Sequence, residues 1–144
     1  MDARAWDERY AGAELVWSSR PNRFVEAEVA GLPPGLALDL AAGEGRNAIW
    51  LAEQGWQVTA VDFSSVGLDK GRRLLASHER ARDLHVDWVH HDVLSFDPGP
   101  VGYDLALQLH GGGRWSNPFV RALGARTTAG AAAARLLTLT PARP

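Results

Sequence analysis

Residues 36–62 read LALDLAAGEGRNAIWLAEQGWQVTAVD, and this stretch decides the fold. The apolar run at 36–40 follows a Pro-Gly pair, which is typical of a buried parallel strand. A loop of small residues at 41–45 comes next, and the apolar spacing of 47–54 predicts a helix. Residues 58–61 then predict a second strand. Strand, glycine loop, helix and strand in this order predict a βαβ unit.

The sequence on either side of this unit continues the alternation of helices and strands. The pattern predicts a short capped helix between Asn22 and Gly31, a helix from Ser64 or Ser65 towards His78, and strands at 86–89 and 103–109. This order favours an α/β fold, a doubly wound (Rossmann-like) parallel sheet. Ligands of such sheets bind beyond the carboxyl ends of the strands, so we expect the site there.

Composition restricts the class of protein. A length of 144 residues predicts one domain, and 46% hydrophobic with 22% charged residues is typical of a soluble globular chain. The absence of cysteine excludes disulfides, zinc–thiolate sites and thiol nucleophiles. The charged start of the chain does not resemble a signal peptide, and no apolar run reaches the length of a membrane span. We therefore expect a cytoplasmic protein.

The charge pattern changes near the end of the last predicted strand. Residues 1–104 hold ten Lys or Arg and seventeen Asp or Glu, whereas residues 105–144 hold five Arg and no acid. We therefore predict a domain at 1–109 and a Gly/Ala/Arg-rich tail at 110–144 that is poorly ordered or unrelated to it. Only the stretch 136–140 is apolar enough to pair as a strand. On this interpretation the sheet is incomplete at its C-terminal end and the 103–109 strand is an exposed edge.

The glycine loop permits two kinds of cofactor. Gly43 and Gly45 fit the dinucleotide fingerprint, and Asp62 follows Gly43 by 19 residues, close to the spacing of about 20 that a ribose-binding acid has. On this spacing NAD(P) is a candidate. Asp39 and Glu44, however, place carboxylates where a pyrophosphate would lie, and like charges repel. A cationic cofactor without phosphate fits these acids better.

The same residues resemble a known family. The stretch at 38–52 is similar to the cofactor loop and first helix of class I S-adenosylmethionine (SAM)-dependent methyltransferases. Residues 6–10, Trp17 and 21–22 resemble the N-terminal segment of the bacterial branch related to tellurite-resistance methyltransferases, and 55–64 resembles its second strand. The resemblance covers about residues 5–109 and implies SAM as the cofactor.

The resemblance also implies which residues contact the cofactor. Asp39 would face its aminoacyl end, and Asp62 would accept hydrogen bonds from both ribose hydroxyls. The remaining implied contacts are the backbone of Ala41, Gly43 and Gly45 along the methionine and ribose, Phe63 beside the adenine, and Asp92 and the Val93 backbone at the adenine edge. Tyr10 and Trp17 are expected to close over the site, although large aromatic side chains also serve as ordinary core.

The three acids also have interpretations that involve no cofactor. Asp39 can be a solubilising strand-end charge, Asp62 a helix-dipole charge and Asp92 an ordinary turn acid. Arg46 and Asn47 can simply start the helix or can order the loop by a hydrogen bond. His90 and His91 lie next to each other, but successive strand residues point to opposite faces, so we predict no metal site.

Methyl transfer from a sulfonium requires alignment and exclusion of water more than it requires an acid or base. We therefore predict transfer to a small-molecule acceptor and assign no catalytic residue, His110 being the one nameable candidate for a base. The alternatives are an NAD(P)-binding oxidoreductase domain and a non-catalytic SAM-binding remnant. A nucleic-acid partner is not expected, because the tail arginines lack interleaved aromatic residues. The sequence predicts neither the acceptor nor an oligomeric state.

Overall fold

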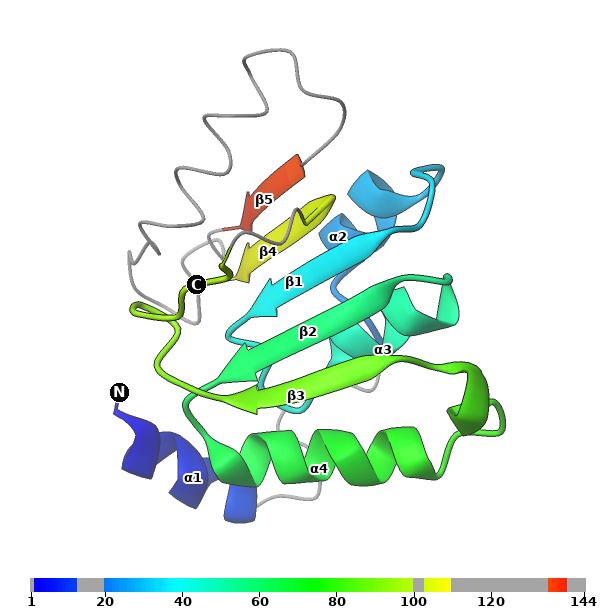
Figure 1. The fold of residues 1–144 in the computed structure, drawn as a ribbon. Helices are drawn as coiled ribbons and strands as arrows, with labels where there is room; N and C mark the ends of the chain where they lie inside the picture. The colour runs from blue at the N-terminus through cyan, green and yellow to red at the C-terminus, as the bar shows by residue number, and fades with distance from the viewer. Residues whose placement is uncertain (1, 13–19, 100–102, 110–134, 140–144) are drawn as a thin grey trace.

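The computed structural model describes residues 2–12, 20–99, 103–109 and 135–139. Within these residues, ten elements follow one another (Figure 1). They are α1 (Ala3–Ala11), α2 (Arg23–Val29), β1 (Leu36–Leu40), α3 (Arg46–Glu53), β2 (Gln57–Asp62), α4 (Ser65–Ala76), the 3-10 helix η1 (Ala81–Asp83), β3 (Val86–His90), β4 (Leu105–Leu109) and β5 (Arg135–Leu139).

The strands form one parallel sheet in the order β3-β2-β1-β4-β5. The chain moves outward from β1 to β2 and β3, and then returns across the sheet to β4 and β5. The strand order therefore reverses between β1 and β4, which is the position where doubly wound sheets bind ligands. The predicted fold class is confirmed.

The βαβ unit lies within one residue of its predicted bounds. Burial explains the agreement, because β1 and β2 are both nearly covered by the rest of the chain. Helix α3 buries Ala48, Leu51 and Ala52 on one face, and the chain leaves it through Gly55 at φ 97°, a conformation that glycine adopts without strain. Side-chain pattern and turn chemistry agree here, so the local sequence is enough to predict the bounds of these elements.

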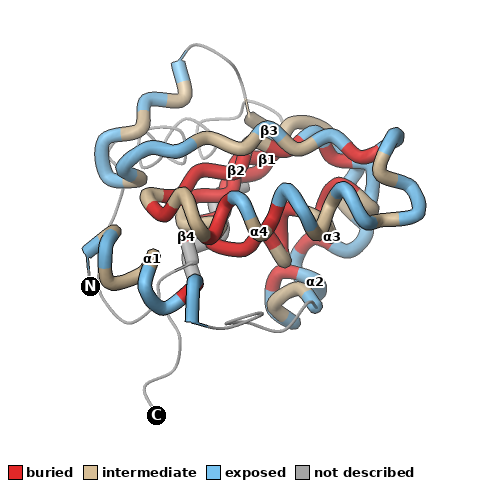
Figure 2. The backbone as a smooth tube through the Cα atoms, turned by 90° about the horizontal axis from the view of Figure 1, so that it is seen from below, coloured by how far each residue is buried: buried red, intermediate tan, exposed pale blue. Residues whose placement is uncertain are grey.

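The main core lies between the sheet and the helices α2, α3 and α4. Figure 2 shows the buried residues concentrated in β1, β2 and α3, with exposed residues on the outer side of α4. The largest members of this core include Leu51, Trp56, Leu105 and Leu107, all of them buried. At about 25 cal/mol per Å² of apolar surface, such side chains contribute about 1.5–3 kcal/mol each.

A smaller core covers the other face of the sheet. Leu38, Leu40, Val61 and Ala106 are buried there and pack against side chains of the connection from β3 to β4, among them Phe96. The return of the chain from β3 to β4 thus crosses this second face. Residues that alternate along β1 and β2 therefore serve two cores, as expected for a sheet buried on both sides.

The expectation that the fourth strand is an exposed edge is wrong. Strand β4 lies between β1 and β5, with Leu105 opposite Arg135 and Leu109 opposite Leu139 in a parallel register. The apolar stretch near 136–140 therefore does pair, as the sequence allowed. The pairing satisfies the backbone groups of β4 that an edge would leave open.

Helix α1 was not predicted from the sequence. Asp2 caps it, because its side-chain Oδ1 accepts a hydrogen bond from the Ala5 N–H at 2.9 Å. Only Tyr10 of this charged helix is buried. Figure 1 shows α1 at the edge of the sheet towards which the strands point, beside the start of α4. The helix therefore lies at the predicted binding edge.

Candidate functional site

The glycine loop after β1 has an unusual backbone. Ala41, Gly43 and Gly45 adopt positive φ angles of 62°, 59° and 81°. Two hydrogen bonds hold this conformation: the Ala42 N–H donates to the Val61 carbonyl at 3.0 Å, and the Gly45 N–H donates to the Ala42 carbonyl at 2.9 Å. A positive φ costs a non-glycine residue about 1–2 kcal/mol, so Ala41 marks a strained position at the predicted cofactor loop.

Two aromatic side chains pack directly against the glycines. A Cβ on Gly43 would lie 2.6 Å from the Tyr10 hydroxyl oxygen, and one on Gly45 would clash with the Trp88 ring. The Trp88 ring also packs against Gly71, where a Cβ would lie 2.6 Å away. These contacts explain a glycine inside α4 despite its cost to the helix, about 1 kcal/mol relative to alanine. Sequence reasoning missed Trp88.

We expect Gly45→Ala to destabilise the chain more than Gly99→Ala. Both glycines have positive φ, but a Cβ on Gly99 meets nothing within 4 Å, whereas one on Gly45 meets the Trp88 ring. The backbone strain is therefore matched, and the difference in the free energy of unfolding reports the clash, about 1–3 kcal/mol. Urea unfolding of both variants measures it. Equal losses would contradict the packing of Trp88 on the loop.

Asp62 joins the two strand ends on which the predicted site depends. Its Oδ2 accepts from the Gly43 N–H at 2.9 Å, and its Oδ1 accepts from the Ser64 N–H at 2.8 Å. Burial raises the pKa of Asp62, and the Ser64 and Gly43 N–H groups oppose that rise. The side chain is only 5% exposed. Asp62 is therefore a buried group that joins the Gly43 loop to the start of α4, and its loss is expected to reduce stability.

A hydrogen bond between Asp7 and Ser64 joins helix α1 to the start of α4. The Ser64 hydroxyl donates a short hydrogen bond to Oδ1 of Asp7, and its oxygen accepts the Gly67 N–H at 3.1 Å as the cap of α4. The charge of Asp7 also contributes to the raised pKa of Asp62. A third carboxylate, which sequence reasoning did not identify, therefore lies at the predicted cofactor edge.

Asp39, near the end of β1, is a buried acidic side chain. It is 1% exposed, and neither of its carboxyl oxygens has a hydrogen-bond partner among the residues that the structure describes. Burial raises the pKa of Asp39 from 3.8 to about 7, with a further contribution from Asp62 and an opposing one from Arg46. A buried, unpaired carboxyl is costly, and such groups concentrate at functional sites.

Glu44 forms an ion pair, whereas its place in the sequence predicted an unbalanced charge that would repel a pyrophosphate. Its side chain is 3% exposed, and its Oε2 lies 3.5 Å from the Lys70 Nζ of α4. The charge of Glu44 is therefore balanced by a neighbouring cation, which removes one of the two carboxylates that argued against a pyrophosphate. Asp39 and its neighbour Asp62 remain as the acidic groups that disfavour a pyrophosphate at this loop.

The remaining predicted contacts follow β2 and β3. The exposed Asp92 follows β3, and its Oδ1 accepts from the Leu94 N–H at 2.9 Å, which is the geometry of an ordinary turn acid. The Phe63 carbonyl lies 2.9 Å from Nε2 of His90, and the Val93 side chain packs into the smaller core. The His91 N–H donates to the Asp62 carbonyl at 3.0 Å, which brings this turn next to β2.

Other residues singled out from the sequence have structural partners or lie elsewhere. The Asn47 side-chain oxygen accepts from the Asn22 N–H at 2.8 Å, so it orders the segment before α2. Within the described part of the chain, no three His, Asp or Glu side chains are grouped as a metal site. Trp17 and His110 lie outside the described residues.

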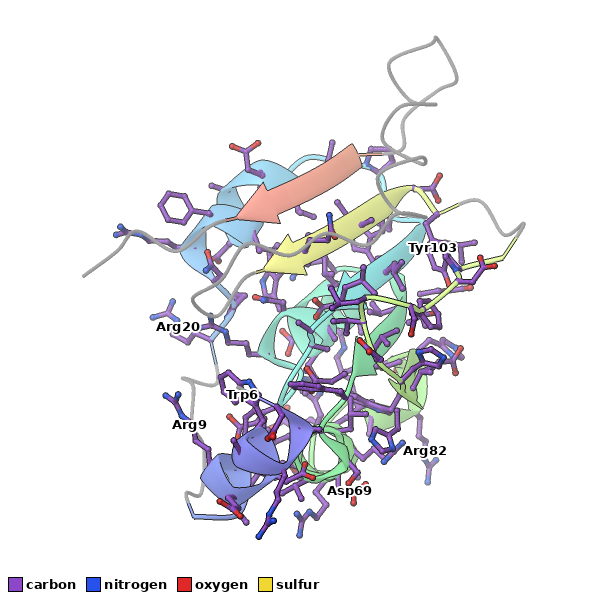
Figure 3. The ribbon with its side chains drawn as sticks, turned by 90° about the vertical axis from the view of Figure 1, so that its left-hand side faces the viewer. Trp6, Arg9, Arg20, Asp69, Arg82 and Tyr103 are labelled. Carbon is purple, nitrogen blue, oxygen red and sulfur yellow. The ribbon has the colours of Figure 1, made fainter. Side chains whose placement is uncertain are left out.

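A separate hollow of about 310 Å³ lies at the opposite end of the sheet. Figure 3 shows Tyr103, one of its lining residues, at the end of the sheet away from Trp6 and Arg9 of α1. The hollow is lined by Leu36, Gln57, Val58, Thr59, His85, Asp87 and Tyr103. Those residues belong to the amino-terminal ends of strands, so the hollow is distinct from the predicted cofactor edge.

Comparison with known proteins agrees with the geometry. Residues 37–125 match the family model described as "Methyltransferase domain", which is more than half of the chain. This chain belongs to that methyltransferase family. The match starts in β1 and extends beyond residue 109, where the sequence placed the end of the domain. The predicted resemblance to class I SAM-dependent methyltransferases is confirmed.

A curated relative supports the same family. The chain is 38% identical over 96 residues to a demethylmenaquinone methyltransferase of Clavibacter sepedonicus, and the match covers 65% of this chain. It covers 38% of the relative, so the chain spans well under half of that protein's length.

Solved structures share the fold of this methyltransferase domain. One, from work on the conversion of a disulfide bond into a thioacetal group during echinomycin biosynthesis, has a TM-score of 0.59 at 27% identity, covering 73% of this chain and 45% of that one. TehB from Haemophilus influenzae has a TM-score of 0.52 at 19% identity, covering 62% of this chain and 30% of that one. The glycopeptide N-methyltransferase MtfA, complexed with SAM, has a TM-score of 0.55 at 24% identity over 64% of this chain and 37% of that one. The latter two likenesses concern the fold alone.

None of the helices in the described segments is long and apolar enough to cross a membrane.

Proposed function

We propose that this chain binds SAM at the carboxyl edge of its sheet and acts in the transfer of the methyl group to a small-molecule acceptor. The observation that carries the proposal is Asp39, a buried carboxyl without a partner among the described residues, next to Asp62 and the glycine loop. A cation bound there would supply the missing charge partner. Family membership supports the choice of SAM among cations. A cytoplasmic location belongs to the same proposal.

The chain offers polar groups suited to each part of the cofactor. Asp39 would pair with the ammonium of the aminoacyl group, and the backbone of Ala41, Gly43 and Gly45 would line the methionine and ribose. Asp62 uses one lone pair of each oxygen for a backbone N–H, and a carboxylate has about four acceptor positions, so two ribose hydroxyls can still donate to it. We assign Phe63, Asp92 and the Val93 backbone to the adenine.

The chemistry requires little of the protein beyond binding and orientation. When bound, SAM supplies a methyl group on a positively charged sulfur, which a nucleophile can displace in line. Asp39 would fix the aminoacyl end of the cofactor and Asp62 its ribose, and Tyr10 from α1 would help to exclude water over Gly43. We propose that residues 1–109 form the cofactor-binding part of the domain, to whose sheet β5 adds a further strand, and we assign no catalytic residue.

An NAD(P)-binding domain is the second candidate. The pairing of Glu44 with Lys70 favours it, because that pair removes one charge that a pyrophosphate would have to approach. Asp39 and Asp62 still disfavour it. The Asp62 carboxylate would repel a phosphate, and an anionic ligand would give the buried Asp39 no positive partner; the nearby Arg46 offsets the repulsion only in part.

Thermal unfolding with each ligand distinguishes the two cofactors. At about 100 times its dissociation constant, S-adenosylhomocysteine (SAH) is expected to add about 2.7 kcal/mol to the free energy of unfolding, whereas NAD adds nothing. The measurement is a melting scan of the full chain with SAH, NAD or no ligand. A shift with NAD and none with SAH would end the methyltransferase interpretation.

A further inference from the structure

Asp39 poses an electrostatic problem in the protein without cofactor. Its carboxyl group is 1% exposed and lacks a hydrogen-bond donor among the described residues. Burial of an isolated carboxylate costs so much that such a group generally remains neutral instead. The geometry alone therefore favours the protonated acid.

The charged groups around Asp39 do not remove the problem. Asp62 on β2 is a like charge, and Arg46 at the start of α3 is the one cation among the described charges that act on the pKa of Asp39. From α1, Asp7 adds negative charge near Asp62, and Tyr10 interacts with Arg46. Beside the loop, the Lys70 ammonium of α4 lies against Glu44, and that pair balances its own charge.

The negative charge of Asp62 favours the protonated form of Asp39, and the two carboxyl groups differ in their hydrogen-bond partners. Asp62 accepts two backbone N–H groups, which stabilise its anion. Asp39 accepts none from the described residues, so the proton belongs on Asp39. The pKa of Asp39, raised to about 7, agrees with this distribution.

We propose that Asp39 is a neutral carboxylic acid in the free protein and that binding of the cationic cofactor releases its proton to the solvent. The O–H bond of Asp39 breaks, its electron pair stays on the carboxylate, and the aminoacyl ammonium of the ligand takes the place of the proton as the positive partner. This inference rests on the proposed function. It adds that cofactor affinity is linked to pH through one identified group.

The linkage fixes the direction of the pH effect. Below the pKa of Asp39 a proton competes with the ligand, so affinity rises with pH and becomes constant above it. For a pKa of about 7, the dissociation constant is expected to be about tenfold lower at pH 8 than at pH 6. SAH carries the aminoacyl group and should release the proton. Methylthioadenosine lacks that group and should bind without release.

Calorimetric titration of the full chain measures the protons directly. SAH and methylthioadenosine are titrated at pH 6 in buffers of different ionisation enthalpy, with the wild type and Asp39→Asn. We expect close to one proton released with SAH in the wild type, and no release with methylthioadenosine or in the variant. Carbon NMR of the aspartate carboxyls follows the proton of Asp39 directly in the free protein, and the signal that is missing in Asp39→Asn is assigned to Asp39. This measurement still tests the proposal if the variant binds SAH too weakly for calorimetry.

The outcomes separate this inference from the proposed function. SAH binding without proton release, or an Asp39 carboxyl already ionised in the free chain at pH 6, would overturn the coupling and leave the cofactor assignment intact. Failure of SAH to bind at all would overturn the proposed function and the coupling with it. An Asp39 signal that titrates near neutrality and shifts to lower pH with SAH would support both.

Discussion

Asp39→Asn is expected to make the folded chain more stable above neutral pH while it weakens cofactor binding. Folding raises the pKa of Asp39 from 3.8 to about 7, so between these values the unfolded chain has lost a proton that the folded chain keeps. The free energy of unfolding of the wild type must therefore fall as the pH rises from about 4 to about 7. At 1.36 kcal/mol per pKa unit, this fall is about 4 kcal/mol at most.

The amide introduced by Asp39→Asn does not titrate, so position 39 no longer lowers the free energy of unfolding as the pH rises from about 4 to about 7. A buried amide without partners has its own cost of about 1–3 kcal/mol, which acts at every pH and cancels when two pH values are compared. Urea unfolding at pH 5 and pH 8 of the wild type, Asp39→Asn and the exposed control Asp83→Asn measures the effect. An equal pH dependence in all three chains would contradict the burial of an unpaired acid at this position.

Loss of binding is the other half of this prediction. The neutral amide introduced by Asp39→Asn cannot carry the charge that pairs with the ammonium of the aminoacyl group, and hydrogen bonds to charged groups contribute about 1.5–3 kcal/mol. SAH affinity should therefore fall by about 10- to 150-fold in Asp39→Asn above pH 7. A variant that is more stable and binds less well would identify Asp39 as a residue kept for function at the expense of stability.

Asp62→Ala is expected to damage both binding and folding. The change removes the acceptors proposed for two ribose hydroxyls, so cofactor affinity should fall by about 1.5–3 kcal/mol. It also leaves the buried Gly43 and Ser64 N–H groups without their acceptor, at a cost of about 1–3 kcal/mol each. Titration calorimetry with SAH and urea unfolding measure the two losses.

Asp62→Asn is the matched control, because an amide keeps one acceptor oxygen and replaces the other with a donor. We expect it to lose less stability than Asp62→Ala and to lose affinity as well. Unchanged SAH affinity in a folded Asp62→Ala chain would return Asp62 to a purely structural role, in which it ties the Gly43 loop to the start of α4.

The βαβ unit at 36–62 was predictable because each of its signals is local. Apolar runs define β1 and β2, small residues define the loop, and Gly55 ends the helix, so propensity, pattern and turn chemistry agree. The positions of Asp39 and Asp62 at strand ends followed from the same pattern. What did not follow was their environment, because burial and hydrogen bonding are set by parts of the chain far away in sequence.

Helix α1 shows why the rest of the site was not predictable. Its charged sequence has no strong apolar period, and its place depends on Tyr10 meeting Gly43 and on Asp7 meeting Ser64, 57 residues further along the chain. The pairing of Glu44 with Lys70 and the position of Trp88 between Gly45 and Gly71 are likewise tertiary contacts. The sequence contains each of these residues, but no local pattern shows which of them contact one another.

The pairing of β4 with β5 illustrates the same limit. The apolar stretch near 136 was visible, but nothing local identifies β4 as its partner across the intervening segment. Only the register of Leu105 with Arg135 and Leu109 with Leu139 shows that β4 is an inner strand. Non-local strand pairing of this kind carries little local sequence signal.

Amide hydrogen exchange with and without saturating SAH tests the central claim most directly, because it locates the bound cofactor on the chain. The Gly43 and Ser64 amides donate to Asp62, next to the proposed ribose position. We predict that SAH slows exchange at residues 39–47 and 62–64 and leaves the strand starts around the opposite hollow unchanged. Unchanged exchange at 39–47 and 62–64 under saturation, or protection confined to the hollow that Thr59 and Tyr103 line, would contradict the account.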